Sequence, residues 1–311
     1  MSNNFPQYVV FGEALTDMLL QEDGKWQSVP GGACWNVARV GARLGISTAF
    51  AGAVSNDLFG DQLAQAGAAA GLEPRFLQRI DASPLLAMVV SQHPPEYFFI
   101  GDDSADLHFD PKKLPPGWRR SAEVIHFGGI SLMRKPLAGK LLAEASAAKQ
   151  ANKRIAFDPN FRSKAHAVDY TETFRVIAAI ASYIKVSDDD LLGIFPDLNP
   201  ALALAELRMI APNAQILLTR GVAGMTLFNG DDVIEQASFE VSVNDTVGCG
   251  DASMGGWMAS LLRHPTANPQ RHLQVSAAAA ALAAIHSGPY APSAAEVESL
   301  LLKNGLKPWL I

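Results

Sequence analysis

The chain has 311 residues, of which 49% are hydrophobic and 18% are charged, so it can build a sizeable core and is not a disordered chain. Its formal net charge is −6 and it has no run rich in lysine or arginine, which argues against a nucleic-acid partner. Two cysteines cannot build a disulfide framework and are typical of a cytoplasmic protein.

No membrane association is expected from the sequence. The N-terminus lacks a basic region and carries Glu13 and Asp17 in its apolar stretch, which is not the pattern of a signal peptide. The longest strongly apolar run, 277–285, is far shorter than a transmembrane helix.

Along the chain, short β-branched or aromatic runs alternate with longer stretches of helical period. The first part predicts a strand over 8–11, a helix over 33–44, a strand over 48–54 and a helix over 58–70, which Gly71 would end. Four further strands, each followed by helical sequence, are predicted at 124–127, 155–157, 183–186 and 216–219. Three helices are predicted near the end, at about 251–263, 273–286 and 293–303.

This alternation predicts an α/β fold with a doubly wound, mostly parallel central sheet and helices on both faces. Two regions, within about 13–30 and 84–104, contain short alternating runs without a following helix. We interpret them as antiparallel strands that stand off the main sheet as a small β lid. Without a linker or a repeat, residues 1–311 are expected to form a single domain with this lid.

The segment from Asp245 to Asp251 runs straight into a predicted helix. Gly248 and Gly250 would let the backbone approach a ligand closely, and the N–H groups of the first helical turn favour an anion there. Asp251 would stand beside that anion as a general base. The alternative is an ordinary helix start in which Asp251 only complements the helix dipole.

Cys249 lies inside the same segment. A helix N-terminus is expected to lower the pKa of its thiol and make it reactive. Because no histidine is nearby in sequence, we favour a small residue tolerated in a tight loop over a catalytic nucleophile.

Five other residues could contact a ligand, and each has an ordinary structural alternative. Gly31 and Gly32 precede Asn36 at a predicted helix start, which could instead be a β-turn and helix entry. Asp17, after the first strand, could accept hydrogen bonds from two neighbouring ligand hydroxyls, or be a solvated loop residue. Arg162 could hold a phosphate or carboxylate, or be a surface arginine.

The acidic run 188–190 follows a predicted strand. It could hold a hydrated Mg²⁺, but the acidic first turn of the next helix is the favoured interpretation. The sequence contains no P-loop motif, no dinucleotide fingerprint after the first strand, no zinc spacing of histidines and no Gly-x-Ser-x-Gly.

Several motifs occur together in one order. They are Gly31-Gly32-x₃-Asn36, Gly52-x-Val54-Ser55-x-Asp57-x-Phe59-Gly60, Asp158-Pro159-Asn160-x-Arg162, Thr219-Arg220-Gly221 and Asp245-Thr246-x-Gly248-x-Gly250-Asp251. In this combination the chain resembles the ribokinase-like (PfkB) family of ATP-dependent sugar kinases over roughly residues 6 to 305. The family fold is a mostly parallel sheet with helices on both faces and a small β lid over the sugar.

The resemblance implies a role for each matching residue. Asp251 would take the proton from the primary hydroxyl of the sugar, and the backbone of Gly248, Cys249 and Gly250 would form an anion hole. The implied sugar contacts are Asp17, Gly31, Gly32, Asn36 and Arg162. The implied ATP contacts are Lys185, Thr219, Gly221, Gly224 and Gly288. Asp190 would help to hold Mg²⁺, and Asp245 a monovalent cation such as K⁺.

Three positions depart from the family pattern. Cys249 replaces the usual alanine, and activity is expected to survive because only the backbone is needed. The Asn-x-x-Glu magnesium motif appears as Ser187-Asp188-Asp189-Asp190, which weakens the metal assignment. The lid segment 97–106 reads Tyr-Phe-Phe-Ile-Gly-Asp-Asp-Ser-Ala-Asp, at the place where several fructokinases and ketodeoxygluconate kinases carry an arginine or tyrosine, and this departure bears on the substrate more than on the reaction.

The motifs are most similar to those of bacterial fructokinases, so fructose is the expected sugar. Ketodeoxygluconate kinases share Asp-Pro-Asn-x-Arg, and a ribosyl compound is a further alternative. The family also allows a homodimer formed through the lid. Outside the kinases, a silent sugar-binding regulatory protein and a nucleotide-cofactor oxidoreductase stay open, although an intact Asp251 and the missing dinucleotide fingerprint argue against them.

Overall fold

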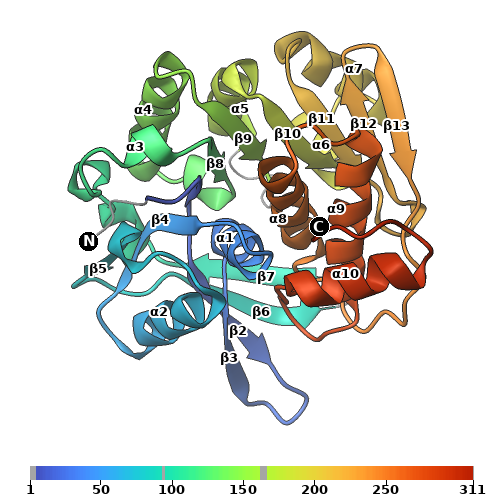
Figure 1. Cartoon of the computed structure of the whole chain (residues 1–311). Helices are drawn as coiled ribbons and strands as arrows, with labels where there is room; N and C mark the ends of the chain where they lie inside the picture. The colour runs from blue at the N-terminus through green and yellow to red at the C-terminus, as the bar shows by residue number, and fades with distance from the viewer. Residues whose placement is uncertain (1–4, 93–94, 162–166, 311) are drawn as a thin grey trace.

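The computed structural model describes residues 5–92, 95–161 and 167–310. A nine-stranded sheet runs through the molecule in the order β13-β12-β11-β10-β9-β8-β1-β4-β5 (Figure 1). Its strands are β1 (Tyr8–Phe11), β4 (Thr48–Ser55), β5 (Leu77–Ile80), β8 (Val124–Gly128), β9 (Arg154–Asp158), β10 (Tyr183–Ser187), β11 (Gln215–Thr219), β12 (Met225–Asn229) and β13 (Asp232–Gln236). All neighbouring pairs are parallel except β11–β12 and β12–β13.

Helices cover both faces of this sheet, as predicted (Figure 1). They are α1 (Ala33–Arg43), α2 (Leu58–Ala70), α3 (Trp118–Ser121), α4 (Leu137–Gln150), α5 (Ala167–Ile180), α6 (Asp188–Ile194), α7 (Pro200–Ile210), α8 (Cys249–Arg263), α9 (Pro269–Ala284) and α10 (Ala294–Lys303).

The central strand β1 is apolar at every position because both of its faces are covered. Val9 and Phe11 belong to one hydrophobic core, which α4 to α7 complete, whereas Tyr8 and Val10 belong to a second core with α1, α8, α9 and α10. A strand covered on both faces has no solvent-facing side, so it becomes a continuous hydrophobic run.

A second sheet of four strands, called the small sheet below, has the order β3-β2-β6-β7. Its strands are β2 (Leu15–Leu20), β3 (Trp26–Gly31), β6 (Leu86–Gln92) and β7 (Pro95–Ile100). They lie within the two segments that break the α/β alternation of the sequence. The pair β2–β6 is parallel, although all these strands were expected to be antiparallel.

Three strands of the main sheet were missed by the sequence prediction. β11 is followed by the hairpin β12–β13 and not by a helix. The turn of this hairpin contains Gly230 at φ +59°, after Asn229, and Asn-Gly is a strong hairpin signal. β5 was missed as well, because its sequence Leu-Gln-Arg-Ile has two polar residues in the middle and no apolar run, unlike the equally short β1. In the part of the chain that the structure describes, no helix is long and apolar enough to cross a membrane.

Candidate active site

Several predicted site residues, among them Lys185, Asp190 and Thr219, lie in or just after the carboxyl-terminal halves of parallel strands, where ligands bind in open α/β sheets, whereas Asp17 and Gly31 belong to β2 and β3 of the small sheet. Two glycines, Gly31 and Gly32, connect β3 to the start of α1. A Cβ atom on Gly31 would lie 2.2 Å from Oδ2 of Asp17, so the missing side chain makes room for this carboxylate. Gly32 has φ +108°, and a Cβ there would collide with the backbone oxygen of Glu13 at 2.8 Å. The Gly-Gly pair therefore follows from close packing between β3, β2 and the end of β1.

The first turns of α1 and α8 meet at a side-chain hydrogen bond. Nδ2 of Asn36 donates to Oδ2 of Asp251 over 2.9 Å, and both residues are buried. The helices pack closely because Gly255 has no side chain: a Cβ there would lie 2.6 Å from Val40. The structure thus brings together two predicted site residues that are 215 positions apart.

The loop before α8 has the geometry of an anion site. Gly248 adopts φ +80°, and a Cβ on it would lie 2.9 Å from Cα of Pro289. The first helical hydrogen bond runs from the Ala252 amide to the Gly248 oxygen. The amides that precede Ala252 in the first turn therefore have no carbonyl one turn earlier in the helix to which they could donate. The amide of Cys249 donates to the Thr246 oxygen over 3.2 Å.

A buried ammonium group lies beside this loop. Nζ of Lys185 is 3.2 Å from Oδ2 of Asp158, with side-chain exposures of 5% and 4%. A Cβ on Gly250 would lie 3.0 Å from the same Nζ.

Burial raises the pKa of Asp158 to about 7, because the desolvation of its carboxylate and repulsion from Asp190 and Asp251 outweigh the attraction of Lys185. The same carboxylates, led by Asp158, raise the pKa of Lys185 against its own desolvation.

The environment of Cys249 contradicts the expectation of a reactive thiol. Its pKa is raised to about 11, because burial and the neighbouring carboxylates of Asp245 and Asp251 all disfavour the thiolate. Burial, reinforced by the carboxylates on either side of the loop, therefore outweighs the helix N-terminus.

The two predicted metal ligands are engaged in local structure. Asp190 forms a capping box at α6: Oδ2 accepts from the Ser187 amide at 2.8 Å and hydroxyl at 2.7 Å, and Oδ1 accepts from the Phe161 amide at 2.7 Å. Asp245 accepts from the amides of Val247 at 3.0 Å and Gly288 at 2.9 Å. Among the described residues, no group of three or more histidine, cysteine or acidic side chains could hold a metal ion.

The predicted ATP contacts lie at neighbouring turns. The Thr219 hydroxyl donates to the Val186 oxygen at 3.4 Å, at the ends of β11 and β10. Gly221 and Gly224 both have positive φ, and a Cβ on Gly224 would lie 2.3 Å from the Gln236 oxygen. Gly288, at φ +69°, faces Val29 of the small sheet. Arg162 lies outside the described residues.

Two buried acids were missed as site residues. Asp158 belongs to the motif that was noted for Arg162, and its position at the end of β9 beside β10 was the available signal. Glu13 is the second residue after the end of β1. Its carboxylate accepts from the Ser131 hydroxyl at 2.7 Å, and burial raises its pKa to about 7.

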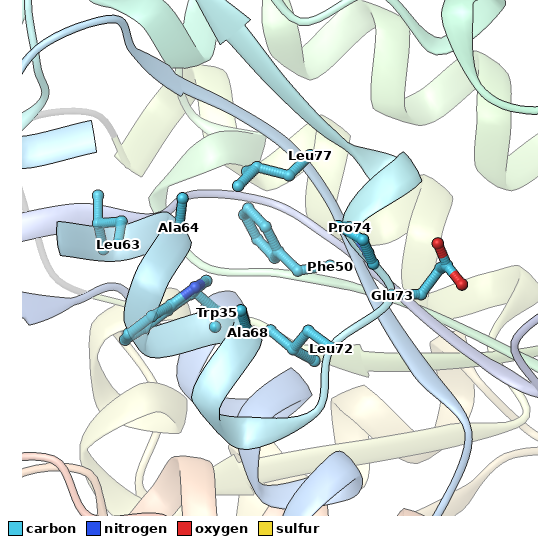
Figure 2. A pocket seen from close by; sticks show the side chains of 10 residues that line it. Trp35, Phe50, Leu63, Ala64, Ala68, Leu72, Glu73, Pro74 and Leu77 are labelled. Atoms are coloured by element: carbon cyan, nitrogen blue, oxygen red, sulfur yellow. The ribbon is translucent and has the colours of Figure 1, made fainter. Parts of the chain in front are cut away.

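On the other side of α1, Trp35 borders a cavity of about 70 Å³ (Figure 2). Its other walls come from α2, β4 and the chain after α2, and they are mostly apolar: Phe50, Leu63, Ala64, Gly67, Ala68, Leu72, Glu73, Pro74 and Leu77. Without convergent polar groups, this cavity is a packing defect and not a second ligand site.

An α/β sheet with a buried carboxylate at a glycine-rich helix start is an arrangement suited to group transfer, and comparison with known proteins identifies the family. Residues 6–296 match the pfkB family carbohydrate kinase domain. The chain therefore belongs to the pfkB family of carbohydrate kinases, as the sequence motifs predicted.

Individual relatives agree with this assignment. The chain is 31% identical over 261 residues to a fructokinase of Klebsiella pneumoniae, which covers 82% of this chain and 84% of that one. It is 30% identical over 260 residues to the aminoimidazole riboside kinase of Salmonella typhimurium, with 82% and 80% covered. The crystal structure of a fructokinase from Xylella fastidiosa with bound ATP superposes with a TM-score of 0.87 at 25% identity, covering 96% of this chain and 99% of that one.

Proposed function

We propose that this carbohydrate kinase transfers the γ-phosphoryl group of ATP to the primary hydroxyl of a sugar, with fructose as the expected substrate. The observation that carries the proposal is the buried Asp251 carboxylate, fixed by Asn36 at the glycine-rich start of α8. A base and an anion site in one helical turn are what a phosphoryl transfer to an alcohol needs.

In the proposed reaction, Asp251 accepts the proton of the primary hydroxyl while the hydroxyl oxygen attacks the γ-phosphorus. The bond between this phosphorus and the β–γ bridging oxygen breaks, and ADP leaves with the electron pair. The hydrogen bond from Asn36 to Oδ2 fixes the orientation of the Asp251 carboxylate that would take the proton. The backbone of residues 248–250 would stabilise the charge on the transferring group.

Lys185 would act as the second source of positive charge. Its Nζ lies next to Gly250 and is held by Asp158, so it is fixed before the nucleotide arrives. A preorganised ammonium group stabilises the equatorial oxygens of the phosphoryl group without reorganisation during the reaction.

The proposed ATP site is formed by Thr219, Gly221, Gly224 and Gly288. A Cβ on Gly221 would meet no atom within 4 Å and one on Gly288 only Val29 at 4.0 Å, so the backbone at these two glycines can be approached by a ligand. Mg²⁺ would neutralise charge on the phosphates. Both oxygens of Asp190 already accept hydrogen bonds, so this residue fits an ion that keeps its own water shell better than a direct ligand.

Asp17 and Asn36 are the proposed contacts to the sugar hydroxyls, with Gly31 and Gly32 giving the sugar close access and Arg162 as a further contact. Fructose is favoured because fructokinases stand among the relatives on both the sequence and the structure side. The riboside kinase keeps a ribosyl compound as the alternative. ADP formation with MgATP and fructose, ketodeoxygluconate, ribose, tagatose or adenosine tests this choice, and turnover on fructose below that on another sugar would reject it.

The proposed base is tested with Asp251→Asn, which keeps the shape of the side chain and an oxygen that can accept from Asn36. We expect kcat to fall by at least about a hundredfold while the sugar still binds, measured by calorimetry. Asp231→Asn, an exposed change in the β12–β13 turn, is the control and should keep full activity. A kcat of Asp251→Asn within tenfold of the unsubstituted enzyme would remove Asp251 from this role.

We further propose that the small sheet is a lid and that a second copy of this chain packs on its outer face. Asp17 pairs with Val29 and with Ala87, so these side chains share the face that looks toward Gly288. The opposite face carries Met18, Met88 and Phe98, which stand side by side across β2, β6 and β7.

This outer face is apolar beyond the row of three, since Leu20, Trp26 and Ile100 on the same face are 41–50% exposed. A continuous apolar sheet face is typical of a protein interface. Light scattering should give the mass of a dimer, reduced to a monomer by Phe98→Glu but not by Met209→Glu, a similarly exposed site on α7. A monomeric unsubstituted protein would refute the dimer.

Two smaller proposals complete the assignment. Asp245, which joins the 245–247 turn to Gly288, would stabilise a K⁺ site beneath the anion hole, and activity in K⁺ compared with tetramethylammonium salts tests it. Both cysteines are free thiols, which fits a cytoplasmic location.

A further inference from the structure

The turn after β8 connects to both places where the small sheet joins the rest of the chain. We call residues 129–134, which include the 3₁₀-helix η4 (Ile130–Leu132), the β8 turn. Ile130 is buried in one apolar cluster with Leu15, Leu85 and Ala87 of the small-sheet region, and Phe99 packs against it. The β8 turn is thus the floor on which the inner face of the small sheet rests.

The first junction is held through Glu13. This residue lies between β1 and β2, and its Oε2 accepts from the Ser131 hydroxyl at 2.7 Å and amide at 3.3 Å. The other oxygen, Oε1, lies 3.5 Å from the amide of Cys34, where β3 has passed into α1. A Cβ on Gly129 would lie 2.3 Å from this carboxylate, so the turn packs directly on it.

The second junction is held by Arg134. Its Nε donates to Oδ2 of Asp106 at 3.0 Å, and its Nη2 donates to the Ser104 hydroxyl at 2.8 Å and to the oxygen of Gly101. Gly101 is the residue at which the chain leaves β7. The Asp106 side chain is 1% exposed, so Arg134 is a partner for a carboxylate that water hardly reaches.

The strand that enters the small sheet is joined to the same point. Ser83 and Ser104 form a parallel bridge, and the amide of Ala105 donates to the Ser83 oxygen at 2.9 Å. One guanidinium group therefore fixes both chain segments that connect β6 and β7 to the main body.

We propose that Arg134 is a positioning residue that sets the resting pose of the small sheet over the sugar site. The inference rests on the proposed function in one respect: that the sugar binds between this sheet and Asp251. A fork with several donors can hold three acceptors in a fixed geometry, which a single ammonium group cannot do. Arg134 acts before the sugar binds, so it contributes to sugar affinity and not to the chemical step.

The test is Arg134→Lys, which keeps a positive charge beside Asp106 but loses the forked set of donors. Asp106→Asn is a second variant, because it removes the buried charge of the acid itself and so leaves no unpaired carboxylate. Hydrogen exchange of the protein without ligands is the first readout. We expect the amides of β6 and β7 to exchange about tenfold faster, the effect of losing one charge-assisted hydrogen bond, while those of β8 keep their rate.

Steady-state kinetics is the second readout. The KM for the sugar should rise about tenfold for the same reason, while the KM for ATP and kcat change less than about threefold. Arg175→Lys, at a surface pair 2.8 Å from Glu206, is the matched control and should change nothing.

Unchanged exchange in β6 and β7, equal acceleration in β8, or a loss confined to kcat would each overturn the proposal. Since exchange requires no turnover, an enzyme inactive on every sugar would overturn the proposed function alone and leave this readout decisive for Arg134.

Discussion

The buried pair of Lys185 and Asp158 is the contact in the site whose loss should be most costly. The perturbations are Lys185→Met, Asp158→Asn and the double variant. At 3.2 Å and an effective dielectric constant of about 20, the attraction is about 5 kcal/mol. Removing one partner leaves the other charged and desolvated, so each single variant should lose about 3–5 kcal/mol of unfolding free energy at pH 8.

The two losses should be unequal. Without Asp158, the ammonium group of Lys185 still faces Asp190 and Asp251, which also raise its pKa. Without Lys185, three acidic groups lie together with no cation to offset their repulsion. Lys185→Met is therefore expected to be the more destabilising change, and the double variant to cost little more than Lys185→Met alone.

Urea unfolding at pH 8 and pH 6 measures the loss of unfolding free energy in each variant. Because the pKa of Asp158 is about 7 even with Lys185 present, the acid in Lys185→Met is protonated at pH 6, and the cost of this variant should shrink there. Lys25→Met is the control: its pair with Asp23 is shorter, at 2.6 Å, but its side chain is 80% exposed, so the change should be nearly neutral. Additive single-variant losses, within about 0.5 kcal/mol, would refute the coupling.

Three further predictions test other parts of the structure. Cys249→Ala should keep kcat within about threefold, because only the backbone is used, and iodoacetamide should label Cys249 slowly at pH 8, since its pKa is about 11; labelling at the rate of an ordinary exposed thiol would contradict this. Gly67→Ala, within α2, should raise the unfolding free energy by about 0.5–1 kcal/mol, because its Cβ would meet Leu72 at an ordinary 3.4 Å. Gly60→Ala should lower the unfolding free energy, because its Cβ would lie only 1.8 Å from the Ser55 oxygen. Urea unfolding measures both changes, and a loss of stability in Gly67→Ala would be inconsistent with the space beside this residue. The pKa of Glu13 rises from 4.5 to about 7 on folding, so this acid adds stability as the pH falls from about 7 to 4.5, and Glu13→Gln should remove that gain. The measurement is the thermal unfolding midpoint as a function of pH. If the midpoints of Glu13→Gln and of the unsubstituted protein differ by the same amount at every pH in this range, the prediction is wrong.

The sequence was sufficient for elements that combine a strong period with a clear end. Helix α2 was predicted over the residues it occupies, because Gly71 adopts the left-handed conformation, φ +89°, that ends it. β13 was missed because it forms the edge of the sheet, is mostly exposed and lacks a hydrophobic run, and its partner β12 was missed with it although the first three residues of β12 are buried. Exposure removes the signal that the prediction uses.

For the site, the sequence predicted residue types and missed relations between them. Asn36 and Asp251 were both named as candidates, but their hydrogen bond depends on the packing of Gly255 against Val40 between two helices. The pKa of Cys249 was predicted in the wrong direction because the helix N-terminus was considered without the burial of the thiol, which is the largest cause, and without the field of the neighbouring carboxylates of Asp245 and Asp251. The burial of a side chain depends on the whole fold, so a local rule does not include it.

The same field explains why a divalent cation should accompany the nucleotide. Asp158, Asp190 and Asp251 all act on Lys185, so one ammonium group faces three acids before any ligand is bound. A triphosphate brought to this place adds further negative charge next to a carboxylate that must stay ionised to act as a base. The anion site at the start of α8 contributes only partial charges. Among the groups described here, Lys185 alone cannot balance the negative charge of three carboxylates and a triphosphate, so we expect ATP without Mg²⁺ to bind weakly. Calorimetric titrations of ATP with and without the metal should show that difference in affinity.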